Sequence, residues 1–283
     1  MSAFLRAAIA AISTLCLAFL LLGSGLLLCT APFTTDFLAQ RFSRFEGSPY
    51  SQEELVAAAN ATRDYTVGSH SRESVQAYTE AAASDDSGEA TGDKDGSGST
   101  ALRPPGDGRP VLTDDALSHL DDVFEVVSAA RVALAVAAAL ALAGCAALGL
   151  GRHKGKASQK NPDTAPDQPS PSTMKQGKGS LWSGRALVAR MLQGSAGLVA
   201  VLFAGIALWA AFDFNGFFSC FHSLFFAAGT WTFSADSLLI RMYPTEFWIG
   251  MGVVWLACVL LACIICFSIG CVLRTLDRQR KQK

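Results

Sequence analysis

The chain has 283 residues, of which 51% are hydrophobic, and its formal net charge is −1. This balance gives no indication of nucleic-acid binding. The charges lie between four long apolar blocks, a distribution that argues against an ordinary soluble domain. The composition therefore predicts an all-α polytopic membrane protein that forms a single membrane domain.

The four apolar blocks predict four transmembrane helices, because ~20 apolar residues in a helix span a bilayer core of ~30 Å. These helices are expected at about 7–31, 128–150, 187–211 and 249–273. The first block has a cleaved signal peptide as its alternative, since Arg6 precedes it. Its apolar run exceeds the ~7–15 residues of a signal-peptide core, and no clear A-x-A site follows. We therefore interpret it as an uncleaved anchor.

The distribution of lysine and arginine predicts the orientation of the helices. Both residues are concentrated in segment 151–186 and in the C-terminal tail, whereas segment 32–127 is acidic and segment 212–248 has one arginine. Cytoplasmic loops of membrane proteins carry the excess of positive charge. We therefore expect both termini and segment 151–186 in the cytoplasm. Segments 32–127 and 212–248 are then extracytoplasmic and form a membrane-proximal cap.

Two helices are predicted within the first extracytoplasmic segment. Ser51 and Glu54 have the spacing of a capping box, which predicts a helix over 51–65. Thr113 or Asp114 is a suitable N-cap for a second helix, with leucine and valine near helical spacing after it. This second helix is expected to continue directly into the second membrane block.

Two other stretches have the composition of flexible inserts. The first, at about 83–110, is rich in Gly, Ser, Asp and Pro. The second, segment 151–186, is rich in Pro, Ser and Lys. Such sequences bury too little apolar surface to offset the entropy lost on ordering. We predict disorder in the first and flexibility in the second.

The eight cysteines do not indicate a disulfide framework, because all except Cys220 lie in or near the membrane blocks. The C-x4-C-x2-C-x4-C spacing from Cys258 to Cys271 could indicate a metal or cluster site. We favour the alternative that these cysteines serve as small hydrophobic residues of an apolar helix. No metal site is therefore predicted.

Segment 212–248 is too rich in phenylalanine for an ordinary connector. It is expected to dip into the outer leaflet, to form a lipid-facing platform, or to line a pocket for an acyl chain. The alternative is that its aromatic residues only anchor the interface. Its candidate substrate-binding residues are Phe221, Phe225, Trp231, Arg241 and Tyr243.

A histidine lies within this aromatic segment, since His222 is surrounded in sequence by phenylalanine. A single histidine in such a setting is more often structural. However, His119 is also predicted on the outer side, and Asp122 follows it by three residues, on the same face of a helix. This carboxylate could orient the imidazole and stabilise its cation, whereas Asp121 points elsewhere. The two histidines and Asp122 are the candidate catalytic residues.

The chemistry that these residues favour is acid–base catalysis near the outer surface of the bilayer. They make a poor zinc site, because no third close ligand completes the set. The remaining histidines, His70 and His153, lie in polar or basic segments, and we interpret both as solvated. No fingerprint of nucleotide binding or of ordinary hydrolases is present.

The sequences FHSLFFAAGTWTF, LLIRMYPTEFW and SHLDDV together resemble a bacterial integral membrane family with four transmembrane helices. This family includes the lipoprotein intramolecular transacylases. The resemblance covers the first anchor, the helix over 51–65, the H-x-x-D-V element and segment 212–248. It implies transfer of an acyl chain from the sn-2 oxygen of a lipoprotein's diacylglyceryl-cysteine to the α-amino group of the same cysteine.

The resemblance also implies partners and location. Diacylated lipoproteins and membrane lipid are the expected partners, without nucleic acid, nucleotide or soluble cofactor. The expected location is the bacterial cytoplasmic membrane, with the active face outward. Neutral His222 would act as base, and His119 with Asp122 as acid or electrostatic partner, although the reverse assignment is nearly as plausible. Arg241 or a protonated histidine would stabilise the oxyanion, with Tyr243 and Trp231 shaping the pocket.

Three other functions compete with this one. A non-catalytic scaffold would tolerate loss of either histidine. A small transporter is disfavoured, because transport paths usually need buried polar groups, and the membrane blocks contain almost no ionisable residues except Arg131 and Arg190 near helix ends. An enzyme that acts on another outer-leaflet lipid would share the histidines and differ in its product.

Overall fold

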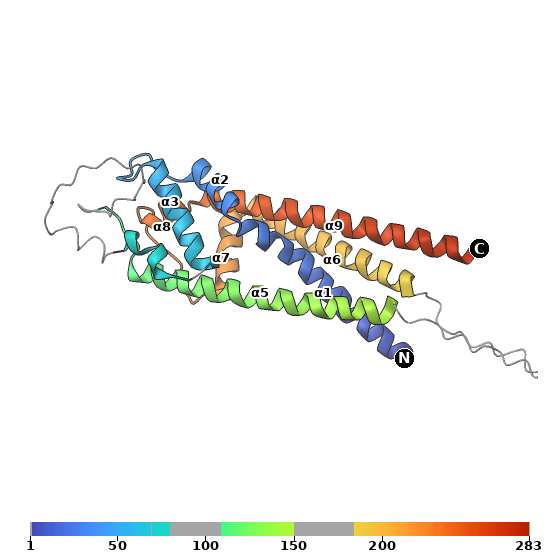
Figure 1. The fold of residues 1–283 in the computed structure, drawn as a ribbon. Coiled ribbons are helices and arrows are strands. Elements are labelled where there is room, and N and C mark those ends of the chain that lie inside the picture. The colour runs from blue at the N-terminus through green and yellow to red at the C-terminus, as the bar shows by residue number, and fades with distance from the viewer. Residues whose placement is uncertain (1, 69, 80–108, 150–183, 283) are drawn as a thin grey trace, which may run out of the picture. The chain divides into compact units, whose positions relative to one another are not determined.

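A computed structural model of the chain describes residues 2–68, 70–79, 109–149 and 184–282. Within these ranges the chain is built from helices, and the one β feature is an isolated bridge between Thr79 and Leu112. The α-helices are α1 (Ala3–Cys29), α2 (Pro32–Phe42), α3 (Gln52–Arg63), α5 (Asp114–Gly149), α6 (Gly184–Phe212), α7 (Phe214–Phe225), α8 (Leu238–Met242) and α9 (Thr245–Gln282) (Figure 1). A π-helix, η1 (Asp64–Gly68), follows α3, and two 3-10 helices, η2 (Arg72–Ser74) and η3 (Gln76–Tyr78), follow η1.

Four of these helices, α1, α5, α6 and α9, are long and apolar enough to cross a membrane. The predicted all-α polytopic fold is therefore confirmed. Many of the large side chains exposed on these helices are hydrophobic, such as Leu142, Val201, Val253 and Ile264. α5 begins at Asp114, after Thr113 accepts a hydrogen bond from the amide of Ala116 (3.3 Å). The predicted cap and the predicted continuation into the membrane block are both present.

The described residues group into two compact units by their contacts, and the single membrane domain stays a prediction. Unit 1 contains Met1–Leu21, Val136–Val199 and Cys263–Lys283. Its helices pack closely through small side chains: Ser13 is buried, and a Cβ added to Gly144 would lie 1.9 Å from the Ser13 Oγ. Small residues let the backbones of membrane helices approach each other closely. Glycine is therefore required at this contact between α1 and α5.

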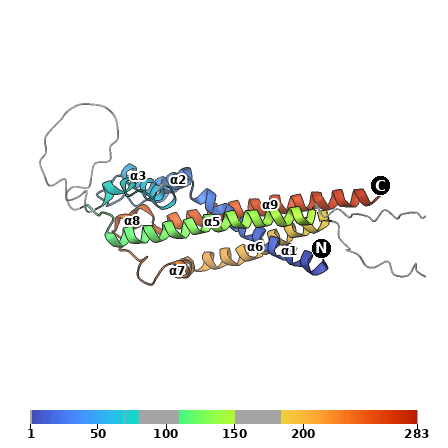
Figure 2. The same ribbon diagram turned by 60° about the horizontal axis from the view of Figure 1, so that its bottom comes forward.

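Unit 2 contains Leu22–Ala135 and Ala200–Ala262. Its core is formed by buried side chains of α2, α3, α8, the first turns of α5 and the start of α9. Figures 1 and 2 show α2 and α3 lying beside each other within this unit. Leu55 on α3, Leu120 on α5, Met242 on α8 and Phe247 on α9 all belong to this core. Segments 32–127 and 212–248 therefore pack on each other, as expected of a common cap.

The start and the end of α3 are both held by specific hydrogen bonds. Ser51 and Glu54 form the predicted capping box, in which each side chain bonds the other residue's backbone amide. Near the end of α3, the Tyr243 hydroxyl donates to the Ala59 carbonyl (2.6 Å) and shares a hydrogen bond with Thr62 Oγ1 (2.6 Å). These contacts connect α3 to the residue that ends α8.

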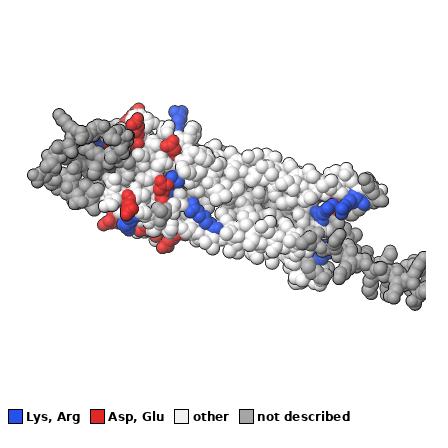
Figure 3. Space-filling model, viewed as in Figure 1, with Lys and Arg blue, Asp and Glu red and all other residues white. Residues whose placement is uncertain are grey.

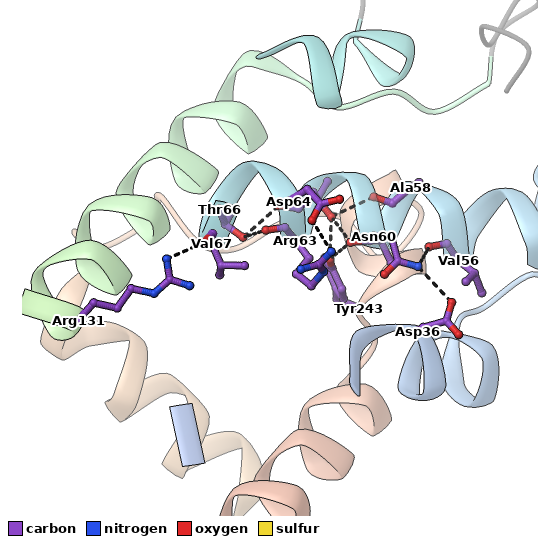
Figure 4. A network of polar contacts seen from close by, with 12 residues as sticks. Asp36, Val56, Ala58, Asn60, Arg63, Asp64, Thr66, Val67, Arg131 and Tyr243 are labelled. Carbon is purple, nitrogen blue, oxygen red and sulfur yellow. Dashed lines mark hydrogen bonds and ion pairs between the residues drawn. The ribbon is translucent and has the colours of Figure 1, made fainter. Parts of the chain in front are cut away.

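A polar network extends this attachment along α3 and η1 (Figure 4). Asn60 donates to Asp36 on α2 (3.2 Å). At the other end of the network, Arg131 of α5 donates to the Val67 carbonyl in η1 (2.6 Å). A cation suits this position, because the last carbonyls of a helix carry partial negative charge.

The structure differs from the sequence-based expectations in several connecting segments. Segment 212–248, treated as a loop, contains α7 and α8, and the acidic segment begins with the unpredicted helix α2. The predicted disordered insert lies outside the described residues, except for its end. There Arg109 pairs with Glu54 (3.2 Å), and the Pro110 carbonyl accepts from Tyr50 (2.7 Å). Most of the predicted flexible loop, 151–183, also lies outside the described residues.

Charged side chains lie mainly outside the apolar stretches. In Figure 3, acidic and basic side chains occur over the part of unit 2 that contains α2, α3 and the first turns of α5. In unit 1, the C-terminal turns of α9 expose Arg274, Arg278 and Arg280. This pattern is compatible with the predicted orientation, which stays a prediction.

Two tyrosine substitutions test the attachment of α3. Tyr243→Phe removes a hydroxyl with two buried partners, so we expect the free energy of unfolding to fall by about 1–2 kcal/mol. Tyr78→Phe is the matched control, because the Tyr78 hydroxyl is buried without a hydrogen-bond partner. Its removal should leave stability unchanged or increase it. Denaturant unfolding in detergent measures both variants, and equal losses would contradict the assignment.

Candidate active site

Unit 2 brings His119 and His222 together although 103 positions separate them in the sequence. His119 lies in the second turn of α5, and His222 lies in the last turn of α7. Their ring centroids are 6.3 Å apart with an interplanar angle of 27°, and each residue is 8% exposed. At this distance two imidazoles can contact one bound group.

Local structure determines how His222 is presented. α7 is capped by Asp213, whose Oδ1 accepts from the amide of Gly216 (2.9 Å). In the last turn of α7, the Nδ1 of His222 lies 2.9 Å from the carbonyl oxygen of Phe218, four residues earlier. A carbonyl oxygen only accepts hydrogen bonds, so Nδ1 carries the proton. The other ring nitrogen, Nε2, therefore has the free lone pair of the neutral imidazole.

The walls around both histidines are aromatic. The His222 ring lies 4.0 Å from that of Phe218 and 4.9 Å from that of Trp231, centroid to centroid. The His119 ring lies 4.8 Å from that of Phe226 and 5.6 Å from that of Phe233. These rings offer little to solvate a charge, so the site favours neutral imidazoles.

This burial lowers the pKa of both histidines. Burial lowers the pKa of His222 below its ordinary value of 6.5, and the hydrogen bond to Phe218 partly opposes the shift. His119 precedes the apolar block at about 128–150, in turns of α5 that are rich in acidic residues. Burial, followed by the neighbouring His222, lowers its pKa to about 4, while Asp122 acts in the opposite direction. Both imidazoles are therefore neutral near pH 7.

Asp122 does not orient His119 in the way the sequence predicted. The Nδ1 of His119 is buried and has no hydrogen-bond partner, and none of the described contacts of His119 is a hydrogen bond to Asp122. The carboxylate only contributes to the local field, because it raises the pKa of His119. Spacing placed the two residues on one face of α5, but none of the described hydrogen bonds joins their side chains.

Asp121 points away from His119, as expected, and contacts another histidine. It accepts from the Tyr65 hydroxyl, pairs with Arg72 (3.3 Å) and lies 3.6 Å from the Nε2 of His70. The His70 ring stacks on Tyr65 (4.7 Å) and on Phe124 (3.9 Å), so the interpretation of His70 as solvated was wrong. The stack packs the residues around η1 against α5. His153 lies outside the described residues.

Two of the predicted substrate-binding residues have other partners. Arg241 donates from Nη2 to the Asp236 carboxylate (3.1 Å) and from Nε to the Asp236 carbonyl (3.2 Å). Its charge is therefore already neutralised by a near neighbour. Tyr243 is a core residue that bonds α3 and packs on Phe247, and burial raises the pKa of its hydroxyl. Tyr243 supports the fold of unit 2 and does not line the site.

The other three predicted residues lie at or beside the site. Trp231 contacts His222 directly, and the Phe221 ring meets His222 edge to face at 5.7 Å. The Phe225 ring packs against that of Phe221 at a tilt of 58°, and Phe225 is 49% exposed, so it forms the outer side of this aromatic surface. Phe218, Phe226 and Phe233 also contact the histidines but were not among the predicted site residues. Phe218 could have been found from its spacing of four residues before His222 on a helix, whereas Phe233 lies in an irregular segment without such a signal.

Two polar atoms of the site have no hydrogen-bond partner. They are the Nδ1 of His119 and the Nε1 of Trp231, and both are buried. Buried polar groups are usually paired, so such atoms suggest a group that is bound during function. Across the described part of the chain, no cluster of three or more His, Cys, Asp or Glu side chains is placed to hold a metal.

Known proteins provide a comparison for this geometry. A family model described as lipoprotein intramolecular transacylase Lit matches residues 12–248. No curated protein sequence matches the chain significantly. The solved structure of the membrane integral lipoprotein intramolecular transacylase Lit from Bacillus cereus is similar in fold, with a TM-score of 0.62 and 16% identity, covering 98% of this chain and 100% of that one.

Two further structures of the Bacillus cereus protein carry a single histidine substitution, to arginine or to alanine. Each has a TM-score of 0.58 and 16% identity, and they cover 99% of this chain and 96% and 97% of their own. At this identity the structures establish the fold, while the family model covers most of the sequence. The chain thus belongs to the lipoprotein intramolecular transacylase family, whose members are membrane acyltransferases.

Proposed function

We propose that this enzyme moves the sn-2 acyl chain of a lipoprotein's diacylglyceryl-cysteine to the α-amino group of that cysteine, giving a lyso-form lipoprotein. The family match supports the reaction class. The observation that carries the proposal for the site is the hydrogen bond from His222 Nδ1 to the Phe218 carbonyl, beside a second buried histidine. It leaves one basic nitrogen available within an aromatic, water-poor site.

In the proposed reaction His222 is the base. The α-amine attacks the carbonyl carbon of the sn-2 ester, and Nε2 of His222 takes a proton from the attacking nitrogen. The tetrahedral intermediate then breaks its bond to the sn-2 oxygen, and the imidazolium returns the proton to that oxygen. One amide and one hydroxyl are formed, and the neutral amine and the ester supply every atom and proton required.

His119 is proposed as a neutral partner and not as an acid. Its pKa of about 4 means that it is unprotonated at neutral pH, so it has no spare proton to give from an imidazolium. A neutral imidazole can still donate one hydrogen bond and accept another. Its position 6.3 Å from His222 lets it hold the ester or the amine against the base. Asp122 is proposed to contribute only through its field.

The intramolecular character of the reaction lowers the demand on the enzyme. Amine and ester already belong to one molecule, so much of the entropic cost of bringing them together is absent. The aromatic walls, including Phe221 and Phe225, suit the acyl chain and the glyceryl group. We propose diacylated lipoproteins as substrates and no soluble cofactor.

The site is proposed to face outward from the bacterial cytoplasmic membrane. The argument rests on the exposed arginines of the last turns of α9 and on the acidic character of segment 32–127. Lipidated cysteines held in the outer leaflet would then reach the two histidines without crossing the membrane.

A pair of reporter fusions tests this orientation. Green fluorescent protein fused after Lys283 should fluoresce, because it remains in the cytoplasm, whereas alkaline phosphatase at the same position should be inactive. Within segment 80–108 the two reporters should behave in the opposite way. Active phosphatase at the C-terminus would overturn the proposed topology.

Two histidine substitutions test the reaction itself. We expect His222→Ala and His119→Ala to reduce formation of N-acyl, sn-2-lyso lipopeptide, by about 10²–10⁴-fold for the base. The assay is tandem mass spectrometry of an N-terminal lipopeptide from cells that make only diacyl lipoprotein, at matched enzyme levels. Ser223→Ala is the control, because Ser223 is exposed beside His222 and bonds the Cys220 carbonyl. Full product with both histidine variants would overturn their catalytic role, whereas no product from the unsubstituted protein would favour a scaffold or another lipid substrate.

The protonation states give a separate prediction. In nitrogen-15 spectra of histidine-labelled enzyme, His222 should be the Nδ1–H tautomer and should gain its second proton only below pH 6.5. His119 should remain neutral until the pH approaches about 4. Since the unfolded chain binds these protons first, stability should be lost as the pH falls below 6.5. An Nε2–H tautomer for His222, or titration above pH 6.5, would disprove the assignment.

A further inference from the structure

The proposed reaction needs a donor for the oxygen that becomes negative in the tetrahedral intermediate. Acyl-transfer enzymes place preorganised hydrogen-bond donors at this oxygen. The sequence suggested Arg241, but this side chain is committed to Asp236 through two hydrogen bonds. A protonated histidine is also a poor candidate, because burial keeps both imidazoles neutral near pH 7.

Trp231 provides a neutral donor beside the proposed base that no protein group occupies. Its ring lies 4.9 Å from that of His222 with an interplanar angle of 35°, and its Nε1 is buried without a hydrogen-bond partner. Two other tryptophans of unit 2 have partners, since Trp248 Nε1 donates to the Tyr243 carbonyl (3.1 Å) and Trp255 Nε1 to the Leu22 carbonyl (2.8 Å). A buried indole N–H usually has such a partner. Trp231 is the exception, and its ring lies beside that of His222, the proposed base.

We propose that the Nε1–H of Trp231 donates to the carbonyl oxygen of the sn-2 ester and stabilises the oxyanion formed when the amine attacks. This inference rests on the proposed function. The indole proton stays on nitrogen throughout, so the donor changes no proton count in the reaction. In the structure the N–H is buried without a protein acceptor, and the ester oxygen would supply that acceptor.

A neutral donor suits this site better than a cation does. An arginine beside His222 would oppose formation of the imidazolium, because like charges in a poorly solvated site repel strongly. An indole N–H stabilises the oxyanion without weakening the base. In an aromatic environment even a neutral hydrogen bond is stronger than in water.

The segment that carries Trp231 can adjust without unwinding a helix. It lies between the end of α7 at Phe225 and the start of α8 at Leu238. Gly229 has a φ of +89°. Residues with a side chain are strained at this angle, so glycine allows the turn. Any movement of Trp231 to admit the ester would therefore involve irregular backbone.

The test removes the N–H while keeping the shape of the ring. 3-Benzothienylalanine at position 231 has sulfur in place of the indole N–H, and Trp231→Phe is the simpler variant. We expect both to lower kcat on purified diacylated lipopeptide in detergent, on the order of 10²-fold, with little change in KM. The midpoints of the pH–rate profile should not move, because the donor does not titrate. Trp209→Phe is the matched control: Trp209 is 45% exposed on α6 and contacts Phe217.

Each outcome decides one question. Unchanged kcat with benzothienylalanine would overturn the donor role, while the transacylase function would stand. An increased KM with unchanged kcat would mean that Trp231 only packs against the substrate, which also overturns the donor role. A wild-type enzyme that forms no N-acyl product would instead refute the proposed function, and the oxyanion donor with it. Loss of kcat in both Trp231 variants and not in Trp209→Phe would establish the donor.

Discussion

The site depends on how the first turns of α5 are held in unit 2. On one face, Ala116, Leu117 and Leu120 are buried in the core that α3 and α8 share. Beside this face, Asp121 accepts from Tyr65 and pairs with Arg72. With these contacts made, His119 is directed to the remaining face, where α7 and the aromatic segment lie against it. A change in the rotation of α5 would separate the two histidines.

The aromatic surroundings then determine the chemistry that the histidines can perform. Little water reaches either ring, so both stay neutral, and a base that starts neutral can accept a proton from an amine. The bond from His222 Nδ1 to the Phe218 carbonyl selects which nitrogen is free. The same rings provide a surface that suits acyl chains. Apolar walls, two imidazoles and one unpaired indole N–H are together consistent with an ester substrate held at a membrane surface.

Contacts that helical spacing does not indicate explain why several sequence-based expectations were wrong. Tyr243 and Arg241 follow the aromatic segment closely, and an ionisable group there suggested a role in binding. In the folded protein the Tyr243 hydroxyl, at the end of α8, shares a hydrogen bond with Thr62 of α3. The charge of Arg241 is neutralised by Asp236. His70 is in a polar stretch, yet it stacks between Tyr65 and Phe124. These partners are too distant in sequence, or too irregular in structure, for spacing to indicate them.

The sequence by itself determined the features that depend on local patterns. Four apolar blocks specify four long helices, because a helix satisfies its own backbone hydrogen bonds in hydrocarbon. Ser51 and Glu54 specify the start of α3, and the motif around His222 carries the family resemblance. Only the tertiary structure decided that His119 and His222 share one site and that Asp122 makes no hydrogen bond to His119. The physical reason is that periodicity states which face of a helix a residue occupies, whereas the rotation of that helix and the partners of each face are decided by packing between segments that are distant in the chain.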